Sequence, residues 1–115
     1  MSPGRSTIDE AKKGAAELVV LAAIEREPTH GYELARLIAE RSRGALTFNF
    51  ASLYATLYRL EERGLIQGRW VERAGQRRRR HYRITGKGLD ALQAQRRDWD
   101  EFFQLVRDLA GMSHA

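Results

Sequence analysis

The amino-acid sequence predicts a mainly α-helical protein with one small β-hairpin, which places it in the α+β class. Apolar residues recur with helical spacing in four segments, 9–26, 29–41, 49–64 and 86–110. In the segment 65–84 the spacing changes to every second residue, which is typical of strands. A chain of 115 residues is expected to fold as one domain with a modest core.

Composition limits the possible functions. The net charge is +5 and the pI is about 10.1, which favours a polyanionic partner. There is no cysteine, and His30, His81 and His114 are not spaced as metal ligands, so we expect no metal, no cofactor and no enzymatic activity. The longest apolar run, Leu18 to Ile24, is too short to cross a bilayer, and the N-terminus lacks the apolar stretch of a signal peptide. We therefore expect a cytoplasmic protein with no membrane partner.

The first two helices are expected to support the rest of the chain. Residues 1–8 are polar and are expected to form a flexible arm. The helix 9–26 contains a stretch that is apolar on all sides, which indicates burial. The helix 29–41 can be capped by either Thr29 or His30, since both offer a side-chain acceptor.

The third helix, 49–64, has clear start and stop signals. The side-chain oxygen of Asn49 can accept from the free N–H groups of the first turn, and Gly64 can end the helix in the left-handed conformation. Together with the preceding helix and a short connection, it matches a helix-turn-helix arrangement. Its apolar stripe consists of Leu53, Leu57 and Leu60.

The side opposite this stripe is expected to be short and polar. Such a side is compatible either with an ordinary core helix or with a helix that enters a DNA major groove, and the helix alone leaves both open. Hydroxyl and guanidinium groups there could bond bases or phosphates. We expect this side to carry Ser52, Thr56 and Arg59, flanked by Tyr54 and Tyr58.

The segment 65–84 is expected to form a hairpin with Gly75 in its turn, which would complete a winged helix. Seven arginines and one acid, Glu72, fall within fifteen residues of this hairpin. A guanidinium binds phosphate through two hydrogen bonds and stays charged, so a basic wing beside a helix-turn-helix favours nucleic acid over plain solvated surface. The arginines are Arg69, Arg73, Arg77, Arg78, Arg79, Arg80 and Arg83.

The last helix, 86–110, is expected to begin after the cap Thr85 and to be followed by a short tail, 111–115. Apolar residues with heptad spacing form a seam along this helix that extends past the winged-helix core. The seam needs a surface to pack on, and a second copy of the chain would supply it. The residues expected at the dimer interface are Leu18, Leu89, Leu92, Trp99, Phe103, Val106 and Leu109.

Four motifs resemble the PadR family of winged-helix transcriptional regulators. They are HGYELARLI, ASLYATLYRLEERGLI, the single Trp70 in the first wing strand, and RRRRHYRITGKGLDAL. The resemblance implies a winged helix-turn-helix domain at 9–85, a dimerisation helix at 86–110 and no further C-terminal domain. It also implies a homodimeric DNA-binding repressor that an effector releases from its operator.

By position, the resemblance also implies roles for individual residues. Tyr32 matches a tyrosine that contacts the DNA backbone, and Trp99 matches an aromatic that lines an apolar effector cavity. Three positions depart from the usual pattern: Ala51 where many members have Gly, Ala55 where many have Pro, and His81 where Tyr is common. The full expected DNA-binding set is Tyr32, Asn49, Ser52, Tyr54, Thr56, Tyr58, Arg59, Arg77, Arg78, Arg79, Arg80 and His81. The expected effector set is Leu92, Trp99, Phe102 and Phe103.

The main reading is a homodimer on a pseudo-palindromic double-stranded operator, with half-sites spaced by roughly 34 Å or a multiple of it. Two alternatives remain open at this stage. In the first, the chain is a protein-interaction module whose arginines meet an acidic partner surface. In the second, it sequesters a small aromatic or hydrophobic ligand at Trp99, where the simpler reading is dimer core, and DNA binding is secondary.

Overall fold

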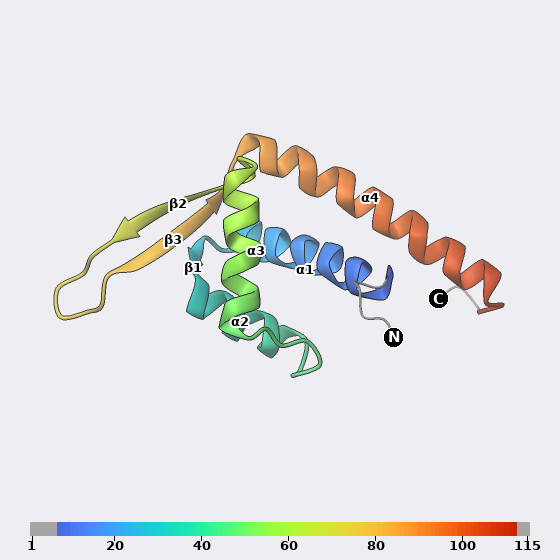
Figure 1. Ribbon diagram of the computed structural model, residues 1–115, viewed down its shortest axis with the longest axis horizontal. Helices are drawn as coiled ribbons and strands as arrows, with labels where there is room; N and C mark the ends of the chain where they lie inside the picture. The colour runs from blue at the N-terminus through green and yellow to red at the C-terminus, as the bar shows by residue number, and fades with distance from the viewer. Residues whose placement is uncertain (1–6, 113–115) are drawn as a thin grey trace.

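The computed structural model describes residues 7–112, with side chains in the first helix from residue 14 onward. Within this part, four helices and a small antiparallel sheet confirm the predicted fold class (Figure 1). In chain order the elements are α1 (Thr7–Arg26), β1 (Thr29–His30), α2 (Gly31–Arg41), α3 (Phe50–Glu62), β2 (Ile66–Val71), β3 (Arg79–Ile84) and α4 (Gly86–Leu109).

The two ends of the chain differ in part from expectation. α1 begins at Thr7, so the last two residues of the expected arm are helical. The remainder of that arm, 1–6, and the end of the expected tail, 113–115, lie outside the described residues.

Residues 29–30 form a strand instead of the first turn of the second helix. They pair with Tyr82 and His81 of β3, which gives them an extended backbone. His30 still caps α2 as expected, because its Nδ1 accepts a hydrogen bond from the backbone N–H of Glu33 at 3.3 Å. A two-residue strand has no detectable periodicity, so only its pairing with β3 reveals it.

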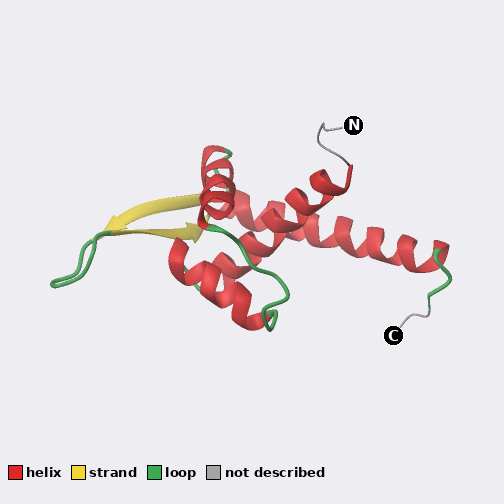
Figure 2. Ribbon diagram, turned by 60° about the horizontal axis from the view of Figure 1, so that its bottom comes forward, coloured by secondary structure: helices red, strands yellow, loops and turns green. Residues whose placement is uncertain are grey.

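The sheet has the order β1-β3-β2, with both pairs antiparallel. β2 and β3 form the predicted hairpin, here called the wing, from the Ile66–Ile84 pair at its base to the Val71–Arg79 pair. Gly75 lies in the turn with φ of 74°, a left-handed conformation that favours glycine. The wing projects from one side of the helical core, and α4 projects from the other (Figure 2).

The core is a single apolar cluster that joins the three N-terminal helices to the base of the wing and the start of α4. Its α1 part confirms the expected burial of the first helix, and its α3 part contains the predicted leucine stripe. α3 is therefore fixed to the core along one side. The fully buried large side chains are Val20, Leu21, Ile24, Leu34, Leu53, Leu57, Leu60, Ile66 and Leu92.

α4 begins where the chain passes close to the end of α3. The Thr85 hydroxyl accepts a hydrogen bond from the Gly88 N–H at 3.0 Å and so caps the helix as expected. A Cβ on Gly88 would lie 2.0 Å from the carbonyl oxygen of Leu65. A residue that weakens a helix by propensity is thus required here by packing.

α4 extends well past the core. Its 24 residues give a helix of about 36 Å. The radius of gyration is 16.1 Å, compared with about 13 Å for a compact chain of this length. Among residues 7–112, no helix is both long enough and apolar enough to cross a membrane.

Candidate nucleic-acid interface

One side of α3 is buried, and it includes a residue that was expected on the other side. Leu53, Leu57 and Leu60 are at most 1% exposed, but Thr56 is also only 3% exposed. Its hydroxyl donates to the carbonyl oxygen of Ser52 at 3.0 Å. Thr56 follows Leu53 by three residues and precedes Leu60 by four, so it must share their side of the helix. The prediction that Thr56 lies on the exposed side is wrong.

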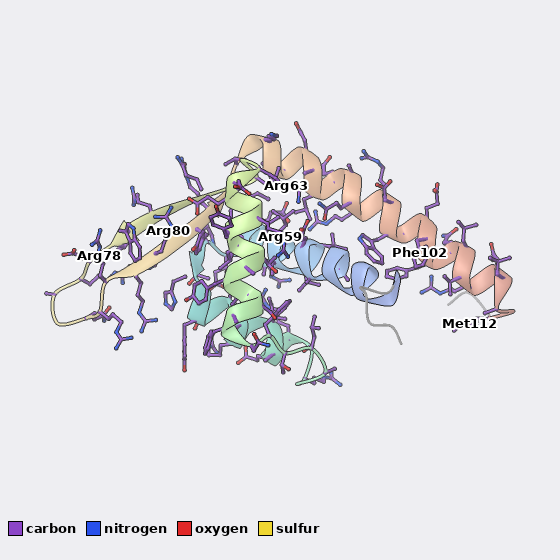
Figure 3. All side chains as sticks on the ribbon, in the orientation of Figure 1. Arg59, Arg63, Arg78, Arg80, Phe102 and Met112 are labelled. Carbon is purple, nitrogen blue, oxygen red and sulfur yellow. The ribbon has the colours of Figure 1, made fainter. Side chains whose placement is uncertain are left out.

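Arg59 also turns away from the exposed side of α3. Its Nε lies 3.5 Å from a carboxylate oxygen of Glu17 in α1, and its Nη2 donates to the Thr56 hydroxyl at 3.2 Å. Arg63, just after α3, donates to the same carboxylate at 2.8 Å. Figure 3 labels both arginines at α3. In this structure Arg59 joins α3 to α1, and it is not on the side where base contacts were expected.

The exposed side of α3 is smaller and more apolar than expected. Ser52 is exposed beside it, and its backbone N–H is held by the side-chain oxygen of Asn49 at 2.8 Å, which confirms Asn49 as the N-cap. The exposed residues of this side are Ala51, Tyr54, Ala55, Tyr58 and, in the last turn, Glu62. The two alanines leave room for a close approach to the helix.

A row of three half-exposed aromatic rings crosses from α2 to α3. Tyr32 stacks on Phe50 with ring centroids 5.8 Å apart, and Phe50 lies 6.4 Å from Tyr54. Tyr54 also lies over Gly31, where a Cβ would come within 2.7 Å of the phenol oxygen. Phe50 was not expected at the interface, because its spacing continues the leucine stripe. It lies at the N-terminal end of α3, where the core does not cover it.

Arg80 braces the wing against α3. A carboxylate oxygen of Glu61, in the last turn of α3, accepts hydrogen bonds from the Gly68 N–H at 3.1 Å and from the Arg80 guanidinium. A Cβ on Gly68 would lie 2.5 Å from the Arg80 Nε. The absence of a side chain at Gly68 therefore gives the Arg80 guanidinium the space that it occupies. Arg80 lies nearer to α3 than Arg78 does (Figure 3). Arg80, expected to bind phosphate, thus already has a carboxylate partner.

The arginines of the outer wing remain exposed. The Arg78 guanidinium lies 4.8 Å from the centroid of the Trp70 ring and 3.5 Å from Glu72, with more than half of its side chain in solvent. Arg77 is exposed as well. These side chains have the charge and the accessibility that phosphate binding requires.

A cleft of about 500 Å³ lies between the wing and the start of α2. The Arg79 guanidinium lies 5.8 Å from the Tyr32 ring centroid, and the His30 and His81 rings are 5.3 Å apart. The cleft thus brings together four residues of the expected DNA-binding set and His30, which was expected only as a cap of the second helix. They are His30, Tyr32, Arg77, Arg79 and His81.

His30 is held in its neutral form. Its partial burial, and then the charges of Arg79 and His81, lower its pKa, while Glu33 acts in the opposite direction. Its Nδ1 faces two groups that can only donate, the Glu33 N–H at 3.3 Å and an Arg79 N–H at 3.4 Å. This nitrogen must therefore be unprotonated, and protonating it would remove the cap of α2.

The second half of α4 carries an aromatic cluster. Trp99 lies 5.8 Å from Phe102 and 5.5 Å from Phe103, measured between ring centroids, and both phenylalanines are about half exposed. Trp99 is partly covered, since a Cβ on Gly14 of α1 would lie 3.4 Å from its ring. The expected interface residues Leu89, Val106 and Leu109 are exposed in the single chain, whereas Leu18 packs on the core.

Leu92 occupies a different place from the one expected. It is 0% exposed and belongs to the core of its own chain. It therefore has no surface to offer to a second chain or to an effector. Heptad spacing selected it correctly as a buried residue, but spacing does not reveal which chain supplies the cover.

The fold and the basic wing define a winged helix-turn-helix protein. The sequence matches the transcriptional regulator PadR-like family over residues 20–94. The chain belongs to this family, which confirms the predicted resemblance. Members of the family are transcriptional regulators and not enzymes, and transcriptional regulation is accordingly the class of function of this chain.

Solved structures agree with this assignment. A PadR family transcriptional regulator from Eggerthella lenta is 28% identical with a TM-score of 0.78, and the match covers 92% of this chain and 90% of that one. A PadR-like transcriptional regulator from Bacillus cereus is 27% identical with a TM-score of 0.74, covering 90% and 99%. A curated relative from Lysinibacillus sphaericus, named "Uncharacterized protein X", is 27% identical over 94 residues, 82% of this chain and 86% of the relative.

The neutral state of His30 predicts a loss of stability in acid. The folded-state pKa lies below the unfolded value of about 6.5, so the unfolded chain binds more protons. The stabilisation is present above pH 6.5 and is lost as the pH falls through the folded pKa. In urea unfolding between pH 7.5 and 5, His30→Asn keeps a capping side chain and should show a smaller decrease in the free energy of unfolding than wild type. Equal pH dependence of His30→Asn and wild type would contradict the role of His30.

Proposed function

We propose that the chain is a homodimeric, sequence-specific DNA-binding regulator that acts as a repressor. In this proposal the exposed side of α3 enters the major groove and the outer wing binds phosphates of the same duplex. The observation that carries it is the exposed side of α3, with the Tyr32–Phe50–Tyr54 row beside it, in a chain whose outer wing arginines Arg77 and Arg78 are exposed to solvent. A helix N-terminus beside the cleft, at His30, adds a further favourable site for backbone phosphate.

The homodimer is supported by the apolar side of α4. Leu92 and Val106 are two heptads apart and so lie on the same side of the helix. The core covers this side at Leu92 but leaves it open at Val106, which is 42% exposed. Figure 3 labels Phe102 in the part of α4 that projects beyond the core, and Met112 just after the end of this helix. A second copy of α4 would bury the open part and would place two α3 helices on one pseudo-palindromic operator.

The effector site is proposed at the same place. Trp99, Phe102 and Phe103 offer three rings of differing orientation next to the proposed dimer seam. A flat aromatic or hydrophobic molecule could stack there, and its binding would release the dimer from DNA. The proposal assigns no role to Leu92, because this residue is fully buried.

Removing an outer wing arginine should weaken binding to all DNA alike. With DNA selected from a random pool and with unrelated DNA, Arg77→Ala and Arg78→Ala should each lower affinity by a similar factor. Each should also reduce the slope of log K against log salt by about 0.9 per lost phosphate contact. Arg97→Ala, the same change on an exposed position of α4, is the control. Fluorescence anisotropy measures all of these affinities. Absence of DNA binding even at low salt would instead support a protein-interaction module.

A charge on the apolar side of α4 should abolish the dimer. Val106→Glu would place a carboxylate at the proposed seam, and we expect a monomer in sedimentation velocity and at least a tenfold loss of operator affinity. Gln104→Glu adds the same charge on the opposite side of α4 and should leave a dimer. The monomer fold should survive in Val106→Glu, since Val106 is exposed in the single chain. A dimeric Val106→Glu would contradict this interface.

Trp99 should report on effector binding. In a Trp70→Phe background, which leaves Trp99 as the single tryptophan, planar aromatic compounds should change its fluorescence and weaken operator binding. Trp99→Ala should lose the response to these compounds while keeping DNA affinity. If neither fluorescence nor operator affinity responds to any compound of this class, Trp99 is dimer core only.

A further inference from the structure

The N-terminal half of α3 presents apolar side chains where a DNA-reading helix meets base edges. Phe50 is the first residue of α3 and is 49% exposed. Ala51 and Ala55 are also exposed, one and five residues further along the helix. We call these three residues the apolar reading surface. The N-terminal residues of a recognition helix are those that reach base edges.

The exposed residues of α3 lack the side chains that usually read guanine and adenine by paired hydrogen bonds. Guanine is read by Arg or Lys and adenine by Asn or Gln. The exposed positions of α3 hold none of these four, and Arg59 is engaged by Glu17. The polar groups that remain are Ser52, the tyrosine hydroxyls, the Glu62 carboxylate at the C-terminal end of α3, and the side-chain amide of the N-cap Asn49. The available chemistry on this surface is therefore mainly apolar contact.

The Phe50 ring is held in place without being buried. It stacks on Tyr32 with an angle of 17° between the ring planes, and its centroid lies 6.4 Å from that of Tyr54. Because the ring is already held on two sides, it loses little conformational entropy when its exposed part contacts another molecule. The free energy of that contact is therefore not cancelled by an entropy cost. Phe50 has no donor or acceptor, and in the major groove the one apolar feature that distinguishes bases is the C5-methyl group of thymine.

We propose that the apolar reading surface recognises thymine methyl groups in the major groove, with Phe50 as the principal residue. The inference rests on the proposed function, since it needs α3 to lie in the groove. It adds the chemical feature that is read and the residues that read it. Burying one methyl group against such a surface corresponds to about a fourfold change in Kd for each half-site.

The test replaces single dT nucleotides by dU, which removes the C5-methyl and leaves base pairing unchanged. Wild-type protein is first used to select bound DNA from a random pool, and each dT of the selected half-site is then replaced in turn. Wild type should lose about fourfold in affinity at particular dT positions. Phe50→Ala should bind more weakly and no longer distinguish dT from dU at one of these positions, while Ala55→Gly should erase the difference at another.

Phe50→Leu is the matched control, because it keeps an apolar side chain and should keep most of the dT preference. If Phe50 only supports Tyr32 and Tyr54, Phe50→Ala will weaken dT and dU DNA equally, and this result would overturn the role of Phe50. Equal affinity of wild type for dT and dU at every position would overturn the whole inference while leaving the proposed function intact. Failure of wild type to select any DNA would instead refute the proposed function and this inference with it.

Discussion

The packing of α3 on the core decides which of its residues can reach another molecule. Leu53, Leu57 and Leu60 are almost completely buried, with Thr56 between them. Turning the helix about its axis by one residue, about 100°, would bring leucine side chains into water, and each fully buried leucine contributes about 1.5–3 kcal/mol. The orientation of α3 is therefore strongly determined. The same packing leaves Ala51 and Ala55 exposed on the outer side of the helix, where they do not contribute to the core.

Two carboxylates, those of Glu17 and Glu61, connect α3 to neighbouring elements by hydrogen bonds and ion pairs. Glu17 of α1 binds Arg59 and Arg63 on one side of α3, and Glu61 ties Arg80 and β2 to its C-terminal end. All of these pairs are partly exposed, so each contributes modestly to stability. Their larger effect is to engage three arginines that sequence alone leaves available to DNA. Arg80 is the wing arginine engaged in this way, whereas Arg69, Arg73, Arg77, Arg78 and Arg83 remain exposed.

Periodicity and local start and stop signals were sufficient for most of the fold. Asn49 caps α3, and Gly64 and Gly75 adopt left-handed conformations where the sequence predicts a helix end and a turn. The placement of Thr56 could have been corrected from sequence, since its spacing from the leucines is that of the buried side. The pairing of Glu17 with Arg59 could not, because residues 42 positions apart meet only through the packing of α1 on α3. Heptad spacing likewise predicts that Leu92 is buried, but it does not show whether its own chain or a second chain covers it.

In the proposed complex with DNA, this arrangement would separate the source of affinity from the source of selectivity. Charge lies on the wing and around the cleft, where contacts with phosphate are independent of sequence and weaken with salt. Phe50, Ala51 and Ala55 carry no charge, so contacts made there would depend on shape and on apolar groups and would be much less sensitive to salt. α1 connects these parts to the rest of the chain, because Glu17 holds α3 while Gly14, one turn away, lies against Trp99 of α4. Both contacts are made by the same continuous helix, three residues apart. A change in the packing around Trp99 thus has a direct physical route to the position of α3.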